Sequence, residues 1–200
     1  VLSVPAVANG TTAIALGNGA IANGTNNIAI GTSNNNNGIN IVNIGDNNDT
    51  SQYSDYSVLI RPGGGTGIAF RGNSVTIGHD TYPGASGVCI GKGALGKNNN
   101  QNVAIGNDAE AGNTGIAVGH NADASGNGSA ALGAQSIANG VGAIALGSVS
   151  ATTVDTVTMK LLQILNYATM SFADDAAAAT GGIPLGGVYH TAGALKIRIA

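Results

Sequence analysis

The chain is poor in charge and in aromatic side chains. Charged residues make up 8% of its 200 residues and aromatic residues 4%, and tryptophan is absent. An average globular domain carries about 25% charged residues, so an ordinary domain is not expected. With seven Lys and Arg residues and a net charge of -3, the chain lacks the basic patch that nucleic-acid binding requires. The apolar share of 43% excludes disorder of the highly charged, weakly hydrophobic kind.

Disulfides and long apolar runs are also missing. Cys89 is the single cysteine, so no disulfide can form within the chain, and its place in an apolar run predicts a small buried side chain. No apolar run approaches the roughly 20 residues of a membrane-spanning helix, so we expect no membrane insertion by this fragment. Val1 is not preceded by a methionine, and no charged segment leads into an apolar one. We therefore interpret the chain as a fragment or a processed product.

Glycine and asparagine are abundant instead, with 33 and 24 residues, and many of the glycines are periodic. A short apolar segment that ends in glycine recurs nine times, at intervals of 14, 14, 33, 13, 15, 13, 14 and 14 residues. The nine glycines are Gly17, Gly31, Gly45, Gly78, Gly91, Gly106, Gly119, Gly133 and Gly147. A fixed period of this length predicts a solenoid.

A second set of glycines, such as Gly10, Gly24 and Gly38, lies seven residues from the first and divides each coil into two halves. About seven residues accommodate a strand of about five and a turn of about two. Glycine at this density would cost about 1 kcal/mol per residue inside helices. The sequence therefore predicts an all-β fold over residues 1–150, a parallel β-roll solenoid with coils of about 14 residues.

The two halves of a coil differ in what their faces tolerate. One half follows an Ala-x-Ala pattern, as at residues 109–111 and 122–124, so its alanines should point into the roll and its middle residue toward water. The other half, as at residues 13–16, is apolar on both faces. A strand of that kind must be covered on both faces, and the roll interior covers only one.

Self-association is the simplest way to cover the second apolar face, which would otherwise form a large exposed patch. We expect a homotrimer in which these faces share a central core. The predicted trimer interface consists of Ile14, Leu16, Ile28, Ile30, Ile105, Ile116, Val118, Ile144 and Leu146.

The segment AIALGNGAIANGTNNIAIG, residues 13–31, resembles the head repeat of trimeric autotransporter adhesins of the YadA type. The resemblance covers residues 1–150 and is irregular at residues 46–71. It implies a left-handed parallel β-roll, three chains side by side and an adhesive function.

The segment FADDAAAATGGIPLGGVYHTAGALKIRIA, residues 172–200, is similar to a C-terminal module of phage fibre and other virion appendage proteins. Together the two resemblances imply a trimeric fibre or head appendage of a bacteriophage virion. Its partners would be other virion proteins and a host cell-surface receptor or glycan. The alternative is the head of a bacterial trimeric autotransporter adhesin, located on the bacterial cell surface.

Residues 151–200 are expected to form a linker and a small β-rich module that caps the open end of the solenoid. Residues 159–165 could be helical or extended. Asp174 and Asp175 precede four alanines and predict an N-cap and one helical turn, which ends at the glycines 181–182. Residues 183–190 and 194–199 read as a hairpin, and the alternation in the second strand indicates that it is half-buried.

Residues 46–71 break the repeat, and excursions from a regular scaffold are where binding groups concentrate. The predicted contact residues are Tyr53, Tyr56, Arg61, Arg71 and Tyr82, because exposed Tyr and Arg are typical of contact surfaces. The alternative is a decorated loop that packs on its own roll.

We expect no enzyme, no metal site and no cofactor. A polysaccharide depolymerase, a minor alternative, needs two suitably placed carboxylates. The ten acidic residues are scattered, and the cluster Asp46, Asp49 and Asp55 would suit a turn or an ion-binding loop equally well. The letters GKGALG at residues 91–96 match a dinucleotide-binding pattern, but no helix pattern follows them.

Overall fold

The computed structural model describes residues 4–50, 55–62, 72–97, 101–160 and 167–199. The chain divides into two units, Val1–Lys160 and Leu161–Ala200. Within the described ranges, no helix is long and apolar enough to cross a membrane.

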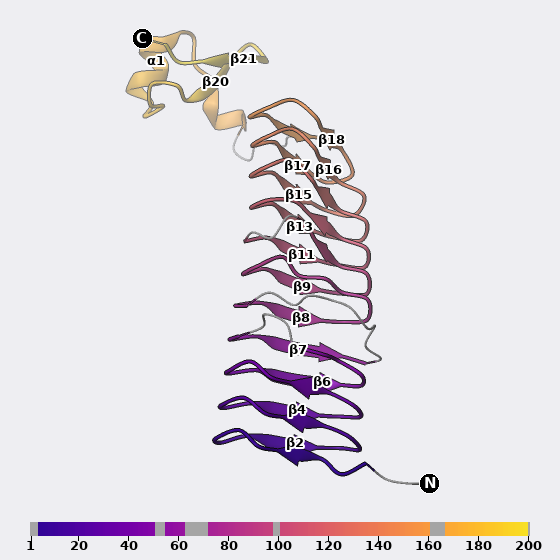
Figure 1. The fold of residues 1–200 in the computed structure, drawn as a ribbon. Helices are drawn as coiled ribbons and strands as arrows, with labels where there is room; N and C mark the ends of the chain where they lie inside the picture. Colours follow the sequence, from indigo (N-terminus) through magenta and orange to yellow (C-terminus); the bar gives the residue numbers. More distant parts are fainter. Residues whose placement is uncertain (1–3, 51–54, 63–71, 98–100, 161–166, 200) are drawn as a thin grey trace. The chain divides into compact units, whose positions relative to one another are not determined.

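The first unit is a parallel β-solenoid in which one strand of each coil stacks on the same strand of the next (Figure 1). These strands form one continuous sheet, called the long sheet below. In spatial order its strands are β2 (Ile14–Leu16), β4 (Ile28–Ile30), β6 (Val42–Gly45), β7 (Val58–Arg61), β8 (Val75–Ile77), β9 (Val88–Ile90), β11 (Val103–Ile105), β13 (Ile116–Val118), β15 (Ala130–Leu132), β17 (Ile144–Leu146) and β19 (Val157–Met159).

The second half of each coil contributes two-residue strands to two short sheets. The first short sheet contains β1 (Val7–Ala8), β3 (Ile21–Ala22) and β5 (Asn35–Asn36), and the second contains β10 (Leu95–Gly96), β12 (Glu110–Ala111), β14 (Asp123–Ala124), β16 (Ile137–Ala138) and β18 (Ser150–Ala151). All pairing within the solenoid is parallel. The predicted all-β solenoid with two strands per coil is confirmed.

The long sheet continues through the irregular segment. Strand β7 lies between β6 and β8, with Gly45 opposite Arg61 and Ile60 opposite Ile77. Arg61 occupies the place of a repeat glycine, so the 33-residue interval between Gly45 and Gly78 contains two long coils. Strands β18 and β19 likewise carry the solenoid to Met159, beyond the predicted end at residue 150. Both differences have one cause, because neither β7 nor β19 ends in the glycine that marks the repeat.

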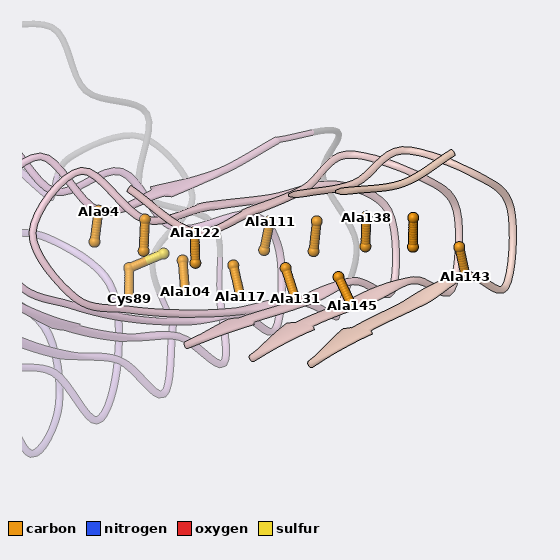
Figure 2. Packing of buried hydrophobic residues seen from close by; sticks show 13 residues of the cluster. Cys89, Ala94, Ala104, Ala111, Ala117, Ala122, Ala131, Ala138, Ala143 and Ala145 are labelled. Carbon is orange, nitrogen blue, oxygen red and sulfur yellow. The ribbon is translucent and has the colours of Figure 1, made fainter. Parts of the chain in front are cut away.

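Alanine fills the interior of the C-terminal coils. Figure 2 shows alanines from the long sheet, such as Ala117 and Ala131, pointing toward alanines of the opposite half-coil, such as Ala111 and Ala138. All four are fully buried. Cys89 belongs to the same cluster, as predicted, and burial raises the pKa of its thiol to about 11. Side chains of this size let the two walls of a coil pack closely around a thin core.

Asparagine fills the interior of the coils between residues 27 and 50. The Nδ2 atom of Asn43 donates to Oδ1 of Asn36 at 2.8 Å, and Nδ2 of Asn48 donates to Oδ1 of Asn43 at 3.0 Å. Asn34 also donates to the backbone oxygen of Gly45, at 2.6 Å. These side chains are fully buried, so their hydrogen bonds offset the loss of contact with water. The sequence analysis did not foresee this polar core.

The repeat glycines are required by the close stacking of the turns. Gly31 has a φ of +123°, and a Cβ added there would lie 1.7 Å from the backbone oxygen of Gly45 in the next coil. That distance is far below any real contact, so a side chain would force the coils apart. Gly147 has a φ of +83°, but no atom of the described residues lies within 4 Å of the corresponding Cβ position.

The second unit contains a 3-10 turn η1 (Tyr167–Met170), the helix α1 (Asp175–Thr180) and an antiparallel hairpin of β20 (Val188–Thr191) and β21 (Ala194–Ile197). Asp174 caps the helix as predicted, because its carboxylate accepts from the Ala177 amide at 2.8 Å. The hairpin is also confirmed, with shorter strands and with Ala192 and Gly193 both at positive φ in the turn. Met159 of the ambiguous 159–165 segment ends β19, and residues 161–166 lie outside the described residues.

Asp175 connects the helix to the end of the chain. The Tyr189 hydroxyl donates to its Oδ1, and the Ile199 amide donates to its Oδ2 at 2.8 Å. The hydrogen bond to Asp175 raises the pKa of Tyr189 to about 12, because ionisation would place two anions together.

The expectation that the second hairpin strand is half-buried is wrong for the single chain. Every residue of β21 is exposed, and Ile199 just beyond it is 82% exposed. The reason is that the buried side chains of the hairpin, Tyr189 and His190, both belong to β20.

Replacing two of the repeat glycines by alanine should distinguish the cost of backbone strain from the cost of a clash between coils. We expect Gly31→Ala to lower the free energy of unfolding by more than Gly147→Ala does. The second change imposes only the left-handed strain of about 1–2 kcal/mol, whereas the first adds a backbone clash. Urea unfolding at one fixed protein concentration measures both variants. Equal losses would show that the turns do not stack as described.

The Cys89 thiol should be unreactive in the folded chain. Its pKa of about 11 is two units above the reference value of 9.0, which corresponds to about 100-fold less thiolate near neutral pH. Burial blocks access as well. We expect a maleimide to label the native protein at least about 100-fold more slowly than the protein in concentrated urea at the same pH. Comparable rates would mean that Cys89 does not lie inside the coil.

Candidate functional site

The outward side chains of the long sheet form a continuous apolar surface, called the ladder face below. Its two rows are Ile14, Ile28, Val42, Val58, Val75, Val88, Val103, Ile116, Ala130, Ile144 and Val157, and Leu16, Ile30, Ile44, Ile60, Ile77, Ile90, Ile105, Val118, Leu132, Leu146 and Met159. Every side chain in both rows is apolar. Ten strand spacings of about 4.8 Å make the face roughly 48 Å long.

In the single chain the ladder face is partly exposed along its whole length. None of its side chains is fully buried, and Leu16 is 63% exposed. The nine residues predicted from the sequence to form the trimer interface all lie on this face. An exposed apolar surface of this length and regularity is a candidate interaction site.

The five predicted contact residues do not form one site. Tyr53 and Arg71 lie outside the described residues. Tyr56 and Tyr82 are exposed but belong to different parts of the coil, because Tyr56 lies in the turn before β7 and Tyr82 pairs with Leu95 on the short-sheet side.

Arg61 corrects the sequence-based prediction, because it is fully buried and cannot be a surface contact. Strand alternation explains its position. Val58 and Ile60 point outward from β7, and Leu59 and Arg61 point into the coil. Burial lowers the pKa of the Arg61 guanidinium, and the nearby Tyr82 and Asp80 partly oppose that shift.

The acidic cluster of the irregular segment is dispersed by the fold. Asp46 accepts from the Thr32 amide in the turn after the long-sheet strand, at 2.8 Å. Asp49 pairs with Asn35 at the end of the first short sheet, and Asp55 lies in the turn before β7. Three carboxylates on three parts of the coil are not the paired acid and base that glycoside hydrolysis needs.

Metal ligands and nucleotide motifs are not assembled either. Among the described residues, no group of three His, Cys, Asp or Glu side chains could hold a metal ion. His79 pairs with the adjacent Asp80 at 2.7 Å, at the surface of a turn. The GKGALG letters lead from β9 into β10, so they belong to the solenoid repeat.

Two rows of polar side chains along one turn of the N-terminal coils were missed by the sequence analysis. In the first row, Asn9 donates to Asn23 at 3.0 Å and Asn23 donates to Asn37 at 2.8 Å. In the second row, Thr12 bonds to Asn26, and Asn26 donates to Asn40 at 2.9 Å. These six residues are called the Asn edge below. The signal was present in the sequence, because each row repeats at 14 residues.

Comparison with known proteins agrees with the coil geometry. The family model described as YadA head domain repeat matches residues 8–34, 111–136 and 124–150, which together make up about a third of the chain. No curated protein matches the sequence. The matched segments contain both strands of several successive coils and the glycine turns between them. The coils at residues 8–34 and 111–150 are therefore YadA-like head repeats.

Proposed function

We propose that this chain is a structural and adhesive protein, exposed at a surface, that associates into a homotrimer through the ladder face. The observation that carries the proposal is the unbroken apolar character of that face over eleven coils. An aliphatic surface of this length is costly to leave in water, and a second copy of the chain presents a matching surface of equal length. The YadA-like repeats support the same conclusion.

Trimeric association would determine what the protein displays. With the ladder faces together in a shared core, the short sheets and the turns would point outward. Three equivalent copies of any outward site would bind a surface with avidity, even if each contact were weak. The ligand we propose is a host-surface receptor, and most simply a glycan.

The setting we propose is a bacteriophage virion, in which the chain would be part of a fibre or head appendage and contact other virion proteins. The similarity of residues 172–200 to a C-terminal module of virion proteins supports this setting. The second candidate is the head of a bacterial trimeric autotransporter adhesin. The YadA-like repeats support this candidate at least as well as they support a virion protein. Antibodies against the chain should label purified virions in the first case and intact bacterial cells in the second.

A catalytic role is not part of the proposal. The dispersed carboxylates Asp46, Asp49 and Asp55 support a non-enzymatic function over a depolymerase spike. The minor alternative would require a cleaved polysaccharide product after incubation with the assembled protein.

The mass of the protein in dilute solution tests the proposal. Three chains of 19.4 kDa make about 58 kDa, and light scattering on a sizing column should find that mass. Ile30→Asp places a carboxylate in the shared apolar core, which costs several kcal/mol without a partner. We expect this variant to elute as a 19.4 kDa monomer.

The matched control is Ile21→Asp, which makes the same change on a short-sheet strand of a neighbouring half-coil, where Ile21 is also half-buried. Asp123→Ala on another short sheet is a second control, and both controls should keep the trimeric mass. A monomeric wild-type protein, or equal effects from Ile30→Asp and Ile21→Asp, would contradict the proposed interface.

A further inference from the structure

Tyr56 occupies a backbone position that recurs from coil to coil and that the other coils fill with small polar residues or glycine. The turn before ten of the eleven long-sheet strands places a residue at a left-handed φ between +52° and +67°, and Tyr56 is in this position with a φ of +55°. The other residues in this column are Thr12, Asn26, Asn40, Asn73, Ser86, Thr114 and Asp155, with glycine at positions 128 and 142. Small polar residues and glycine tolerate that conformation, whereas a bulky side chain there is strained. Strain that the fold retains is a pointer to function.

The ring of Tyr56 is also exposed. Its exposed fraction is 59%, in a chain with few aromatic residues and an otherwise polar column of turns. The backbone fixes its place, because the Tyr56 amide donates to the Ile39 oxygen and the Asn73 amide donates to the Asp55 oxygen, both at 2.9 Å. Tyr56 therefore stands one coil beyond Asn40 and one coil before Asn73, about 4.8 Å from each along the stack.

Polar side chains with hydrogen-bonding groups left over belong to the same region of turns. Asn40 ends one row of the Asn edge and Asn37 ends the other, and their Nδ2 atoms donate to no acceptor among the described residues. Asp55 uses Oδ1 to accept from the Ile39 amide at 2.9 Å, and no donor in the described part of the chain reaches its Oδ2. An exposed tyrosine thus follows Asp55 in the chain and stands one coil beyond Asn40 in the same column of turns.

A neutral sugar matches this set of groups. The C–H face of a pyranose carries partial positive charge, which the negative face of an aromatic ring attracts. Its hydroxyl groups both donate and accept, as Asn40 and Asp55 require. The carboxylate of Asp55, in a chain of net charge -3, disfavours an acidic sugar.

We propose that Tyr56, Asn40 and Asp55 form a contact site for a neutral hexose or N-acetylhexosamine, in which the sugar stacks on the Tyr56 ring. The inference rests on the proposed adhesive function and gives it a location at the N-terminal coils. Each trimer would present three copies of the site.

Binding to printed oligosaccharides tests the site. The probes are neutral oligosaccharides of glucose, galactose, mannose and N-acetylglucosamine, with sialylated and sulfated oligosaccharides as the acidic set. We expect the assembled wild-type protein to bind at least one neutral probe, and Tyr56→Asn to weaken that binding at least tenfold. Tyr56→Phe keeps the ring and should bind within about threefold of the wild type.

Stability separates a binding role from a structural one. Asparagine already occupies this column at Asn26, Asn40 and Asn73, so Tyr56→Asn should keep the trimeric mass and an equal or higher thermal midpoint. Tyr82→Asn, at the other exposed tyrosine discussed above, is the matched control and should bind like the wild type. The combination of weaker binding and undiminished stability is the expected signature.

Several results would overturn the site. Binding by Tyr56→Asn equal to that of the wild type, binding of acidic probes only, or no binding to any printed sugar would each do so. If the wild type is trimeric and binds no sugar, only the site assignment fails. If the wild type is monomeric, the proposed function itself fails.

Discussion

The parallel hydrogen bonding between successive coils is the interaction on which the rest of the structure depends. It places each residue of a coil directly above its counterpart, as Ile14 stands above Ile28 and Asn9 above Asn23. Residues of the same type at one position of successive coils therefore form a row of side chains along the stack. The apolar ladder face, the alanine interior and the Asn edge are all rows of this kind, and each is as long as the sequence keeps the same residue type at that position.

Close stacking restricts what the coil can contain. In the regular coils, glycine is needed where one turn lies on the next, as at Gly31, and small side chains fill the space between the two walls. The longer coil of β7 instead takes Leu59 and Arg61 inside. The solenoid meets the second requirement in two ways, with alanine in the C-terminal coils and hydrogen-bonded asparagine around Asn43. The asparagine interior is stable only because nearly every amide finds a partner in the same or the next coil.

The surface follows from the same restriction. A thin interior of alanine or asparagine buries little apolar area, and in these coils the large aliphatic side chains of the long sheet, such as Ile30 and Leu132, face outward. Association with other copies of the chain would then supply the missing hydrophobic burial. Recognition would be left to the turns, where a single residue such as Tyr56 can change without disturbing the ladder on either side.

The sequence alone determined the period, the two strands per coil and the faces of those strands, because each depends on residues that are close in the chain and repeat. It also located the capped helix and the hairpin near the C-terminus, whose signals are local. It did not determine the course of residues 46–71, since β7 lacks the terminal glycine that marks the other strands. Only the tertiary structure decided that Arg61 points inward, that asparagines such as Asn36 and Asn48 fill a core, and that β21 is exposed. The inward side chains depend on which coils lie above and below them, and the exposure of β21 depends on what packs against the hairpin. In both cases the deciding neighbours are not adjacent in the sequence.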